Sequence, residues 1–456
     1  MEKTNFVTVL LKKKSYRKYY IDFTNGNDSN PGTISLPMKT ITKVNSLTLK
    51  PGESVLFKRG ESWSGIDLIC SNSGSGGKYI TYNCYGNSSL ALPVITGANT
   101  ANQTMKADTK HHINIKNLNL TGTVNNYYCL RLADCHDVYV SGCLIHGAGV
   151  WYGLYVSGIN TVCYNISIMA NEIYSNKKTG LEIGYNNTVL PMIGPANIFV
   201  IGNSIHNNGT VTDTDHGIYL RDCTSGLISG NICYSNTVGS GIKVNTSTGL
   251  TITKNKCYLN KDGFVADAEY TATTTTVWSN NFAYNNTSDG LFIIGPLNGG
   301  KFYNNNLINN NSKGLEFFYE VSGWIIKNNI IFQDRLVTLD DYTSFCIEIG
   351  NGATQNLVNN TLDYNNLVYN SLYTPSDSIC HINATRYNIT TWRALSGNPD
   401  AHSLIADPVF VTNYVNLHLQ SGSTLKTAGI NVSISNDFDG VVRNSSTPSI
   451  GAYEFV

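Results

Sequence analysis

The stretch NEIYSNKKTGLEIG, residues 171–184, decides the fold because its pattern recurs along the chain. The pattern is Asn, any residue, an apolar residue, two residues of any kind, Asn, a turn, Gly, and then two apolar residues separated by one variable position. It returns in NICYSNTVGSGIKVN from Asn231, NKCYLNKDGFVAD from Asn255 and NFAYNNTSDGLFII from Asn281. The first asparagines of successive units are Asn171, Asn203, Asn231, Asn255, Asn281, Asn305 and Asn329, which gives steps of 32, 28, 24, 26, 24 and 24 residues.

Each unit contains short alternating strands and turn residues, without the 3.6-residue period of a helix. One unit is too small to bury its apolar side alone, whereas stacked units share a continuous core. Parallel stacking puts equivalent residues about 4.8 Å apart. The first asparagines are therefore expected to form a ladder at one corner of the coils, in left-handed backbone that Asn tolerates. The pattern predicts an all-β solenoid.

The repeat and both ends of the chain resemble the single-stranded right-handed parallel β-helix of the pectate-lyase-like superfamily. YYIDFTNGNDSNPG from Tyr19, with a short helix expected at about Ile41–Leu47, is similar to the N-terminal cap of many such proteins. HSLIADPVF from His402 and IGAYE from Ile450 are similar to their C-terminal capping segment. The resemblance implies an N-terminal capping segment with the first coils at 19–110, the β-helix core at 111–370, and C-terminal coils with a closing segment at 371–456. Residues 1–18 are expected to form a tail or attachment arm.

The composition excludes some classes of partner. Charged residues are 14% of the chain and the net charge is zero, whereas typical globular domains are about 25% charged. Nucleic-acid binding usually needs a basic patch, which a neutral chain does not suggest. No apolar run reaches transmembrane length, so no membrane insertion is expected. A neutral surface rich in Tyr and Asn favours a polysaccharide partner.

Cysteine usage and the N-terminus bear on location. The 11 cysteines show no CxxC spacing, so neither a zinc pattern nor a disulfide framework is predicted, and buried free thiols are expected. The first 20 residues contain only a short apolar run, FVTVLL, and no recognisable signal peptide. We expect the chain to act on an extracellular glycan or in a virion, and to be a homotrimer if it is a virion appendage.

Stacking the units in register predicts one polar outer face. The residue two positions after each Gly, or its equivalent, is expected to point outward, which gives Arg131, Tyr155, Glu182, Tyr219, Lys243, Val265, Phe292 and Glu316. The residues expected to bind substrate are Arg131, Tyr155, Trp151, Asn245, Asp262 and Asp267. Such a cluster in a chain short of charge indicates a groove for a polysaccharide. A solvated ladder of cross-strand pairs without function is the alternative.

β-Elimination from a uronic-acid polymer is the chemistry that this face favours. The reaction needs a base for the C5 proton, a cation for the neighbouring carboxylate and a proton for the leaving oxygen. Lys243 is the predicted base, if the positive charge of Arg221 keeps it neutral. Arg221 and Arg131 suit carboxylates because guanidinium groups bind them bidentately.

Tyr219 and His216 form an alternative base and acid pair, and Glu182 is expected beside Tyr219. Related β-helix lyases and epimerases, as the resemblance implies, use Lys, Arg, Tyr or His on the same face, and many bind calcium. No cofactor is predicted here, although a calcium ion held by Asp213, Asp215, Asp262 and Asp267 stays open as an alternative.

Two further functions stay open. Glycoside hydrolysis needs two carboxyls, about 5–5.5 Å apart for retention or 6.5–9.5 Å for inversion. The candidates are Asp215, Asp222, Asp262, Asp267 and Glu182. The main outward column is expected never to place carboxylates in adjacent coils, so hydrolysis ranks second. The third function is that of a phage tail spike or fibre that binds a surface glycan without cleaving it.

Overall fold

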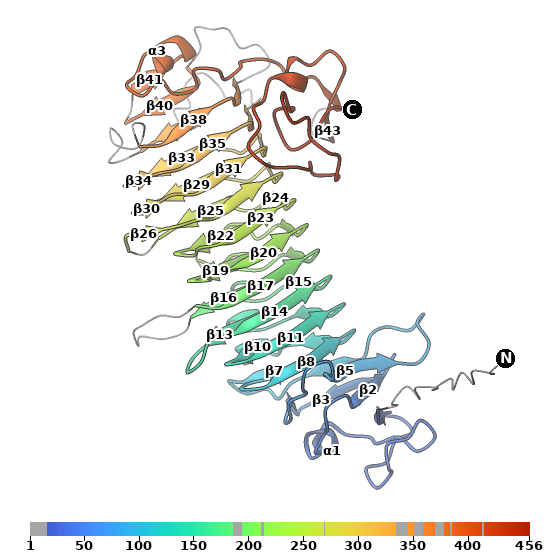
Figure 1. The fold of residues 1–456 in the computed structure, drawn as a ribbon. Coiled ribbons are helices and arrows are strands. Elements are labelled where there is room, and N and C mark those ends of the chain that lie inside the picture. The colour runs from blue at the N-terminus through green and yellow to red at the C-terminus, as the bar shows by residue number, and fades with distance from the viewer. Residues whose placement is uncertain are drawn as a thin grey trace, which may run out of the picture.

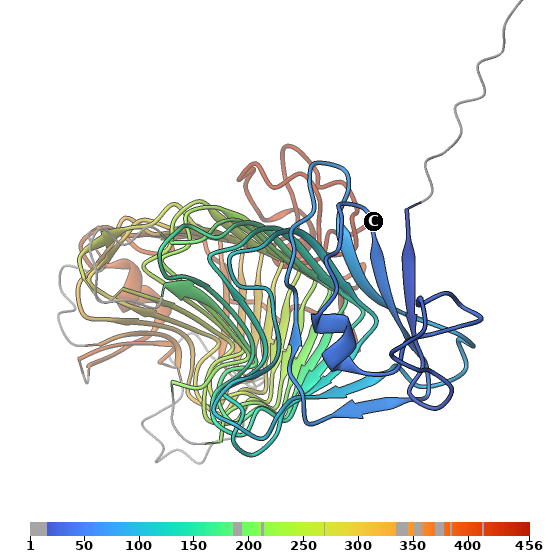
Figure 2. The ribbon, with the colours of Figure 1, turned by 90° about the horizontal axis from the view of Figure 1, so that it is seen from below.

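The computed structural model describes residues 16–185, 194–210, 214–268, 270–333, 345–350, 357, 359–369, 378–383, 385–412 and 415–456. Over these residues the chain winds into a stack of short coils, and three long parallel sheets run along the stack (Figure 1). Seen from below, successive coils lie over one another around a shared interior (Figure 2). The predicted all-β parallel β-helix is confirmed.

From β2 to β40, each coil contributes one strand to each of three sheets, named A, B and C in the order in which the chain meets them. Sheet A contains β1 (Lys18–Ile21), β2 (Ser54–Lys58), β5 (Ile80–Tyr85), β8 (His111–Lys116), β11 (His136–Ser141), β14 (Tyr164–Met169), β17 (Ala196–Ile201), β20 (Gly226–Ser229), β23 (Leu250–Thr253), β27 (Val277–Ser279), β31 (Lys301–Tyr303), β35 (Ile325–Lys327) and β38 (Thr361–Asp363).

Sheet B contains β3 (Ser62–Ser64), β6 (Val94–Thr96), β9 (Asn119–Thr121), β12 (Leu144–His146), β15 (Glu172–Tyr174), β18 (Ser204–His206), β21 (Ile232–Tyr234), β24 (Lys256–Tyr258), β28 (Phe282–Tyr284), β32 (Asn306–Ile308), β36 (Ile330–Gln333) and β39 (Asn366–Tyr369).

Sheet C contains β4 (Leu68–Ile69), β7 (Gln103–Lys106), β10 (Tyr128–Ala133), β13 (Tyr152–Gly158), β16 (Leu181–Tyr185), β19 (Ile218–Arg221), β22 (Ile242–Asn245), β25 (Phe264–Asp267), β29 (Leu291–Ile294), β33 (Lys313–Phe318), β37 (Phe345–Ile349), β40 (Cys380–Ile382) and β41 (Thr385–Tyr387). The small strands are β26 (Ala272–Thr273), β30 (Leu297–Asn298), β34 (Val321–Ser322), β42 (Phe410–Thr412) and β43 (Asn416–Leu419).

The interior is filled by the inward side chains of the three sheets, mostly Ile, Leu and Val, with Cys at several positions. All 11 cysteines are free, and all except Cys84 are buried. The repeated Gly before each sheet C strand is required by close approach of the next coil. A Cβ on Gly217, for example, would lie 2.6 Å from the carbonyl oxygen of Gly241.

The predicted asparagine ladder is present at the corner before sheet B. The Oδ1 atom of Asn203 accepts hydrogen bonds from the backbone N and from Nδ2 of Asn171, both at 3.0 Å. The same arrangement continues from coil to coil and ends where Asn365 donates to Asp400. A second ladder follows sheet B, at Asn176, Asn208, Asn236, Asn260, Asn286 and Asn310.

The predicted backbone of this corner was wrong by one residue. The left-handed position is the residue before each ladder asparagine, as at Ala170 (φ 52°) and Asn280 (φ 54°), and not the asparagine itself. The chain therefore turns sharply one residue early, and the amide side chain that follows points into the stack, where it satisfies buried backbone groups.

Both ends of the stack are covered. Helix α1 (Ile41–Asn45) lies at the N-terminal end and buries Ile41 and Val44, as predicted. At the other end lie helix α3 (Ile389–Arg393) and the 3₁₀ helix η1 (Thr424–Thr427). The closing segment folds back along the outer face of sheet B, where Phe438 and Tyr453 pack on Phe282. None of the described helices is both long enough and apolar enough to cross a bilayer.

Candidate active site

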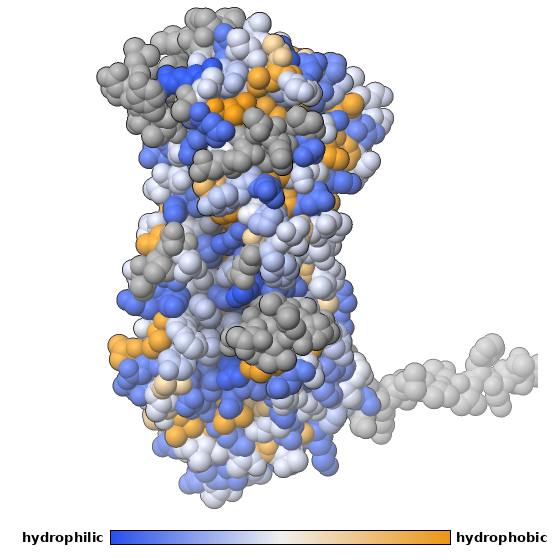
Figure 3. Space-filling model, turned by 90° about the vertical axis from the view of Figure 1, so that its left-hand side faces the viewer, coloured by the Kyte–Doolittle hydropathy of each residue, from blue (hydrophilic) through white to orange (hydrophobic). Residues whose placement is uncertain are grey.

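The outward residues of sheet C form one column in register, as predicted. Cα pairing links Arg131 to Tyr155, Tyr155 to Glu182, Glu182 to Tyr219, Tyr219 to Lys243, Lys243 to Val265, Val265 to Phe292 and Phe292 to Glu316. Two residues further along the same strands, Arg221 pairs with Asn245 and Asn245 with Asp267. The left-hand side of the stack in Figure 1 is largely hydrophilic with scattered hydrophobic patches (Figure 3).

Glu182 lies in the middle of this column, on β16. The side chains of Tyr152 and Thr179 form hydrogen bonds with its carboxyl group. Burial raises the pKa of Glu182 to about 7, although the positive charge of Arg221 acts in the opposite direction. A carboxyl group with this pKa is divided between its acid and base forms near neutral pH, which is the condition for transferring a proton in catalysis.

Aromatic side chains surround Glu182 toward the N-terminal end of the column. Tyr155 is only 5% exposed and stacks on Tyr128, with ring centroids 4.8 Å apart and an interplanar angle of 6°. Trp151 stacks on Tyr127 at 4.3 Å. Burial raises the pKa values of Tyr152 and Tyr155. These two hydroxyls therefore remain protonated, and the predicted substrate contact of Tyr155 is replaced by packing.

The cations of this face each lie beside a carboxylate. The Nε atoms of Arg131 and Arg221 are 3.6 Å and 3.7 Å from carboxylate oxygens of Asp108 and Asp222. About a third of the Arg221 side chain is exposed, which leaves it accessible to an anionic ligand.

Lys243 does not match the predicted role of general base. Its Nζ atom lies 2.8 Å from Oδ2 of Asp267 and 5.6 Å from the centre of the Tyr219 ring. An ammonium group in an ion pair has no acceptor for a proton. Asn245, which is 2% exposed, directs its Nδ2 atom toward the same Asp267 oxygen at 3.4 Å. The two strands that follow β19 in sheet C thus carry a polar group, made of Lys243, Asn245 and Asp267.

His216 and Asp262 are buried in a ladder beside the column. His216 is 3% exposed, and its Nδ1 atom accepts a hydrogen bond from the backbone N of Ser240 at 3.0 Å. Burial lowers the pKa of His216 well below its usual range. The ring is therefore neutral with its proton on Nε2, which makes that nitrogen a hydrogen-bond donor. Asp262 accepts from the backbone N of Asp289 at 3.3 Å, and burial raises its pKa to about 6.

The column continues beyond the residues that the sequence placed in it. Glu316 pairs with Glu348, and Glu348 with His381. The expectation that adjacent coils of the column carry no carboxylates was therefore wrong. The sequence repeat could not be followed to Glu348 because the next step of the asparagine ladder, from Asn329 to Asn365, is 36 residues long.

Glu316 and Glu348 belong to a second polar group near the C-terminal end of the face. Lys313 bridges them, with Nζ 3.1 Å from Glu316 and 3.3 Å from Glu348. Burial and the neighbouring charge of Glu316 raise the pKa of Asp289 to about 7. His381 lies 3.4 Å from Glu348 and stacks on Phe345.

Three of the four carboxylates considered for calcium lie among the described residues. Asp213 lies outside the described residues, and Asp215 is buried. Within the described part of the chain, Asp215, Asp262 and Asp267 do not form a group of three potential metal ligands.

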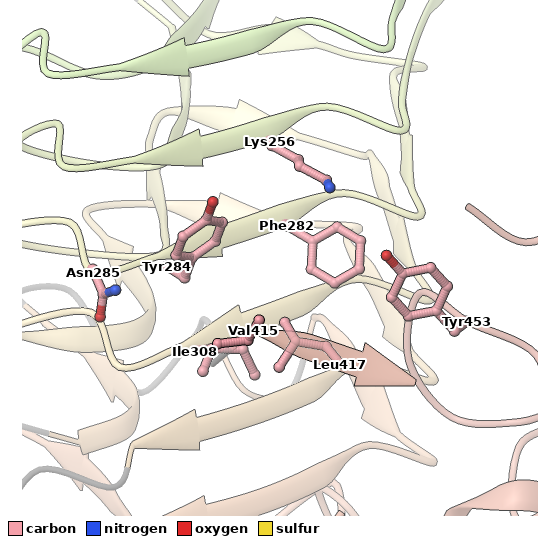
Figure 4. Close-up of a pocket in the computed structure, with 8 residues that line it drawn as sticks. All are labelled: Lys256, Phe282, Tyr284, Asn285, Ile308, Val415, Leu417 and Tyr453. Atoms are coloured by element: carbon pink, nitrogen blue, oxygen red, sulfur yellow. The ribbon is translucent and has the colours of Figure 1, made fainter. Parts of the chain in front are cut away.

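A separate pocket lies between sheet B and the closing segment (Figure 4). Its lining residues are Lys256, Phe282, Tyr284, Asn285, Ile308, Val415, Leu417 and Tyr453. None of these residues is a carboxylic acid, and their apolar side chains belong to the packing of the closing segment. The pocket thus lacks a carboxyl group of the kind that the outer face of sheet C provides.

Comparisons with known proteins agree with the architecture. Residues 104–296 match the family described as "Right handed beta helix region". The structure resembles pectate lyase Pel9A, with a TM-score of 0.56, 16% identity and 97% of each chain covered. It also resembles the GH136 lacto-N-biosidase from Eubacterium ramulus, with a TM-score of 0.55, 17% identity, and 73% of this chain and 68% of the other covered.

A third similar structure is the alginate lyase from Paenibacillus sp. str. FPU-7, with a TM-score of 0.50, 15% identity, and 64% of this chain and 96% of the other covered. No curated protein matches the chain by sequence. The chain has the right-handed parallel β-helix fold that its resemblance to the pectate-lyase-like superfamily predicted, and at these identities the likeness concerns the fold alone.

Proposed function

We propose that the outer face of sheet C binds a uronic-acid polysaccharide and cleaves it by β-elimination around Glu182. The observation that carries this proposal is the position of Glu182, whose pKa is raised to about 7 by burial, in register with Tyr219 and within the field of Arg221. Proteins of similar fold include a pectate lyase and an alginate lyase, which supports a uronate polymer as the substrate class.

In the proposed reaction, the carboxylate form of Glu182 removes the C5 proton of a uronate residue. The electron pair of the C5–H bond becomes the C4=C5 double bond, and the C4–O bond breaks. The leaving oxygen takes a proton from the hydroxyl of Tyr219. Arg221 binds the uronate carboxylate and stabilises the negative charge that develops next to C5.

Lys243 has a supporting role in this scheme. Its ion pair with Asp267 at 2.8 Å keeps a positive charge under the Tyr219 ring. That charge favours the deprotonated form that Tyr219 adopts after it has given up its proton. Arg131, at the other end of the charged stretch, is assigned in this scheme to a neighbouring uronate of the polymer.

A pair of matched variants tests the proposal. Glu182→Gln removes the ionisable group and keeps the shape, whereas Glu172→Gln makes the same change on sheet B of the same coil. With pectate and alginate as substrates, we expect wild type and Glu172→Gln to produce ultraviolet absorbance from the new conjugated double bond. We expect Glu182→Gln to lose at least about 100-fold in rate, since general acid–base groups contribute 10²–10⁴-fold. Equal activity of the two variants would refute the role of Glu182.

Glycoside hydrolysis at the second polar group is the alternative function. It is favoured by Glu316 and Glu348 on adjacent strands and by Asp289, whose pKa is raised to about 7. Carboxyls one coil apart match the short spacing of retaining enzymes, about 5–5.5 Å. Release of reducing ends without new absorbance, abolished by Glu316→Gln and retained in Glu182→Gln, would favour this alternative over elimination.

A further inference from the structure

Three histidines gather on the outer face of sheet A, on a different sheet from the proposed active site. His111 and His112 begin β8, and His136 begins β11 in the next coil. His111 and His136 are Cα partners, and Asp137 follows His136. All three histidines lie within their strands and not in the preceding turns. Three of the nine histidines of the chain are thus brought to one place.

A change in the backbone makes this grouping possible. Side chains normally alternate between the two faces of a strand. His112 (φ 55°) and Asp137 (φ 53°) have left-handed backbone at equivalent positions of adjacent coils. As a result, two consecutive side chains of each strand lie outside, and burial starts only at Ile113 and Val138.

The side-chain atoms converge on one carboxylate oxygen. The Oδ2 atom of Asp137 lies 2.7 Å from Nδ1 of His136 and 3.8 Å from Nε2 of His112. One ligand atom from each of His112, His136 and Asp137 lies within 4.8 Å of the other two. Ligand atoms of a tetrahedral zinc site are about 3.3 Å apart when each bond is about 2.0–2.1 Å. Small rotations of the side chains would therefore bring the three atoms to coordination distance.

The outer contacts of these residues are those that metal ligands need. Asn165, from the next coil, donates to the other oxygen of Asp137 at 3.0 Å. The other ring nitrogen of His112, Nδ1, lies 2.9 Å from Nδ1 of His111. A metal-bound imidazole usually gives its second N–H to an acceptor, which fixes its tautomer and orientation.

The ring of His136 is held as well. It lies between His111 and Tyr164, with centroid distances of 4.7 Å and 4.6 Å and interplanar angles of 11° and 4°. Because the rings are stacked across three coils, the imidazole has little freedom to turn away from Asp137. The group is partly exposed, with 18% of the His112 side chain and 29% of the His136 side chain accessible, so an ion can reach it from solvent.

We propose that this group binds a divalent transition-metal ion, with Zn²⁺ as the best match. His112 Nε2, His136 Nδ1 and Asp137 Oδ2 are the protein ligands, and a water molecule completes the tetrahedron. Two imidazoles and one carboxylate are ligands that zinc accepts, whereas calcium prefers oxygen ligands alone. With the metal on Nδ1 of His136, the neutral ring carries its proton on Nε2.

The bound ion would cross-link β8 to β11, next to the N-terminal cap. Because the unfolded chain lacks the site, binding stabilises the folded state. At Zn²⁺ concentrations about 100 times the dissociation constant, we expect the unfolding temperature of this long chain to rise by about 3 °C.

The test uses the full chain without a histidine tag, stripped with a chelator and then titrated with Zn²⁺. Native mass spectrometry counts the bound ions, and competition with a chromophoric chelator gives the affinity. We expect one Zn²⁺ per chain, with affinity at least about 100-fold weaker in His112→Ala and in His136→Ala. His402→Ala is the matched control, because His402 also lies 2.8 Å from a carboxylate, that of Asp363, and stacks on Tyr364, without a second histidine in the group.

Co²⁺ gives an independent measure of geometry. Intense visible d–d bands are expected in the wild type and in His402→Ala, and their loss is expected in the two ligand variants. If circular dichroism shows that either alanine variant is unfolded, His136→Gln and Asp137→Asn take its place. The proposal is overturned if the wild type binds no Zn²⁺, or if the ligand variants bind it as tightly as the wild type.

Discussion

Glu182 and Tyr219 are Cα partners on the adjacent strands β16 and β19, and burial raises the pKa of Glu182 to about 7. The pairing follows from the coil register, which puts the second residue after each repeated Gly on the same line. A carboxyl group and a phenol are thereby held one interstrand spacing apart by backbone hydrogen bonds. Side-chain chemistry on this face is thus positioned by the rigid part of the molecule.

The raised pKa of Glu182 predicts how stability depends on pH. The folded state favours the protonated form, so the stabilising contribution is complete below the unfolded pKa of 4.5 and is lost as the pH rises through about 7. Glu182→Gln should therefore raise the unfolding temperature at pH 8 more than at pH 4.5. The difference corresponds to about 2–3 kcal/mol at most. Thermal unfolding of both proteins at the two pH values tests this, and an equal effect at both would contradict it.

Arg221 is predicted to bind the uronate carboxylate. Arg221→Lys keeps the charge but loses the bidentate geometry, so we expect the KM for pectate or alginate to rise and kcat/KM to fall by about 10–100-fold. Arg59→Lys, at the N-terminal cap, is the control and should behave as the wild type. Steady-state kinetics on the preferred polymer distinguishes the two. A normal KM in Arg221→Lys would remove Arg221 from the substrate site.

The buried asparagine ladder is predicted to contribute strongly to stability. Asn281 is fully buried, donates to Ile252 and Asn305, and accepts from Asn255. Asn281→Ala leaves these partners unsatisfied, so we expect a loss of about 3 kcal/mol. Asn160→Ala removes an exposed side-chain hydrogen bond to Asp134 and should cost about 0.5 kcal/mol or less. Denaturant unfolding measures both, and similar losses would contradict the ladder's role.

The ion pair of the closing segment gives a further prediction. Arg443 and Glu454 are both buried, 3.2 Å apart, and Arg443 also donates to Asn280 of the coil stack at 2.7 Å. Arg443→Ala leaves a buried carboxylate without its partner, so we expect a loss of about 3–5 kcal/mol. The double variant Arg443→Ala/Glu454→Ala should lose less than the sum of the two single changes. Additive losses in denaturant unfolding would show that the pair is not coupled.

The fold and the register could be predicted because both depend on local spacing. The repeated Asn and Gly mark where each coil turns, and one residue of register decides which side chains face outward. Every predicted Cα partnership from Arg131 to Glu316 is present. The repeat spacing failed to predict the column only where the spacing became irregular. Glu348 was missed because it lies within the 36-residue step from Asn329 to Asn365.

The chemistry of individual residues could not be predicted in the same way, because it depends on neighbours from other coils. Lys243 forms its ion pair with Asp267 of the next strand. The buried ring of His216 accepts a hydrogen bond from the backbone N of Ser240. The histidine group needs two left-handed residues, His112 and Asp137, to place its side chains outside. Neither spacing nor residue type reveals such backbone conformations, and only stacking brings the three ligands together.

The most direct test of the central claim is the pH profile of kcat/KM for β-elimination, followed by absorbance of the unsaturated product. If Glu182 is the base, the rate of the wild type should fall about 10-fold per pH unit below about pH 7 and level off above it. The residual activity of Glu182→Gln should lack this inflection. A wild-type profile without a break near pH 7, or the same break in Glu182→Gln, would contradict the account.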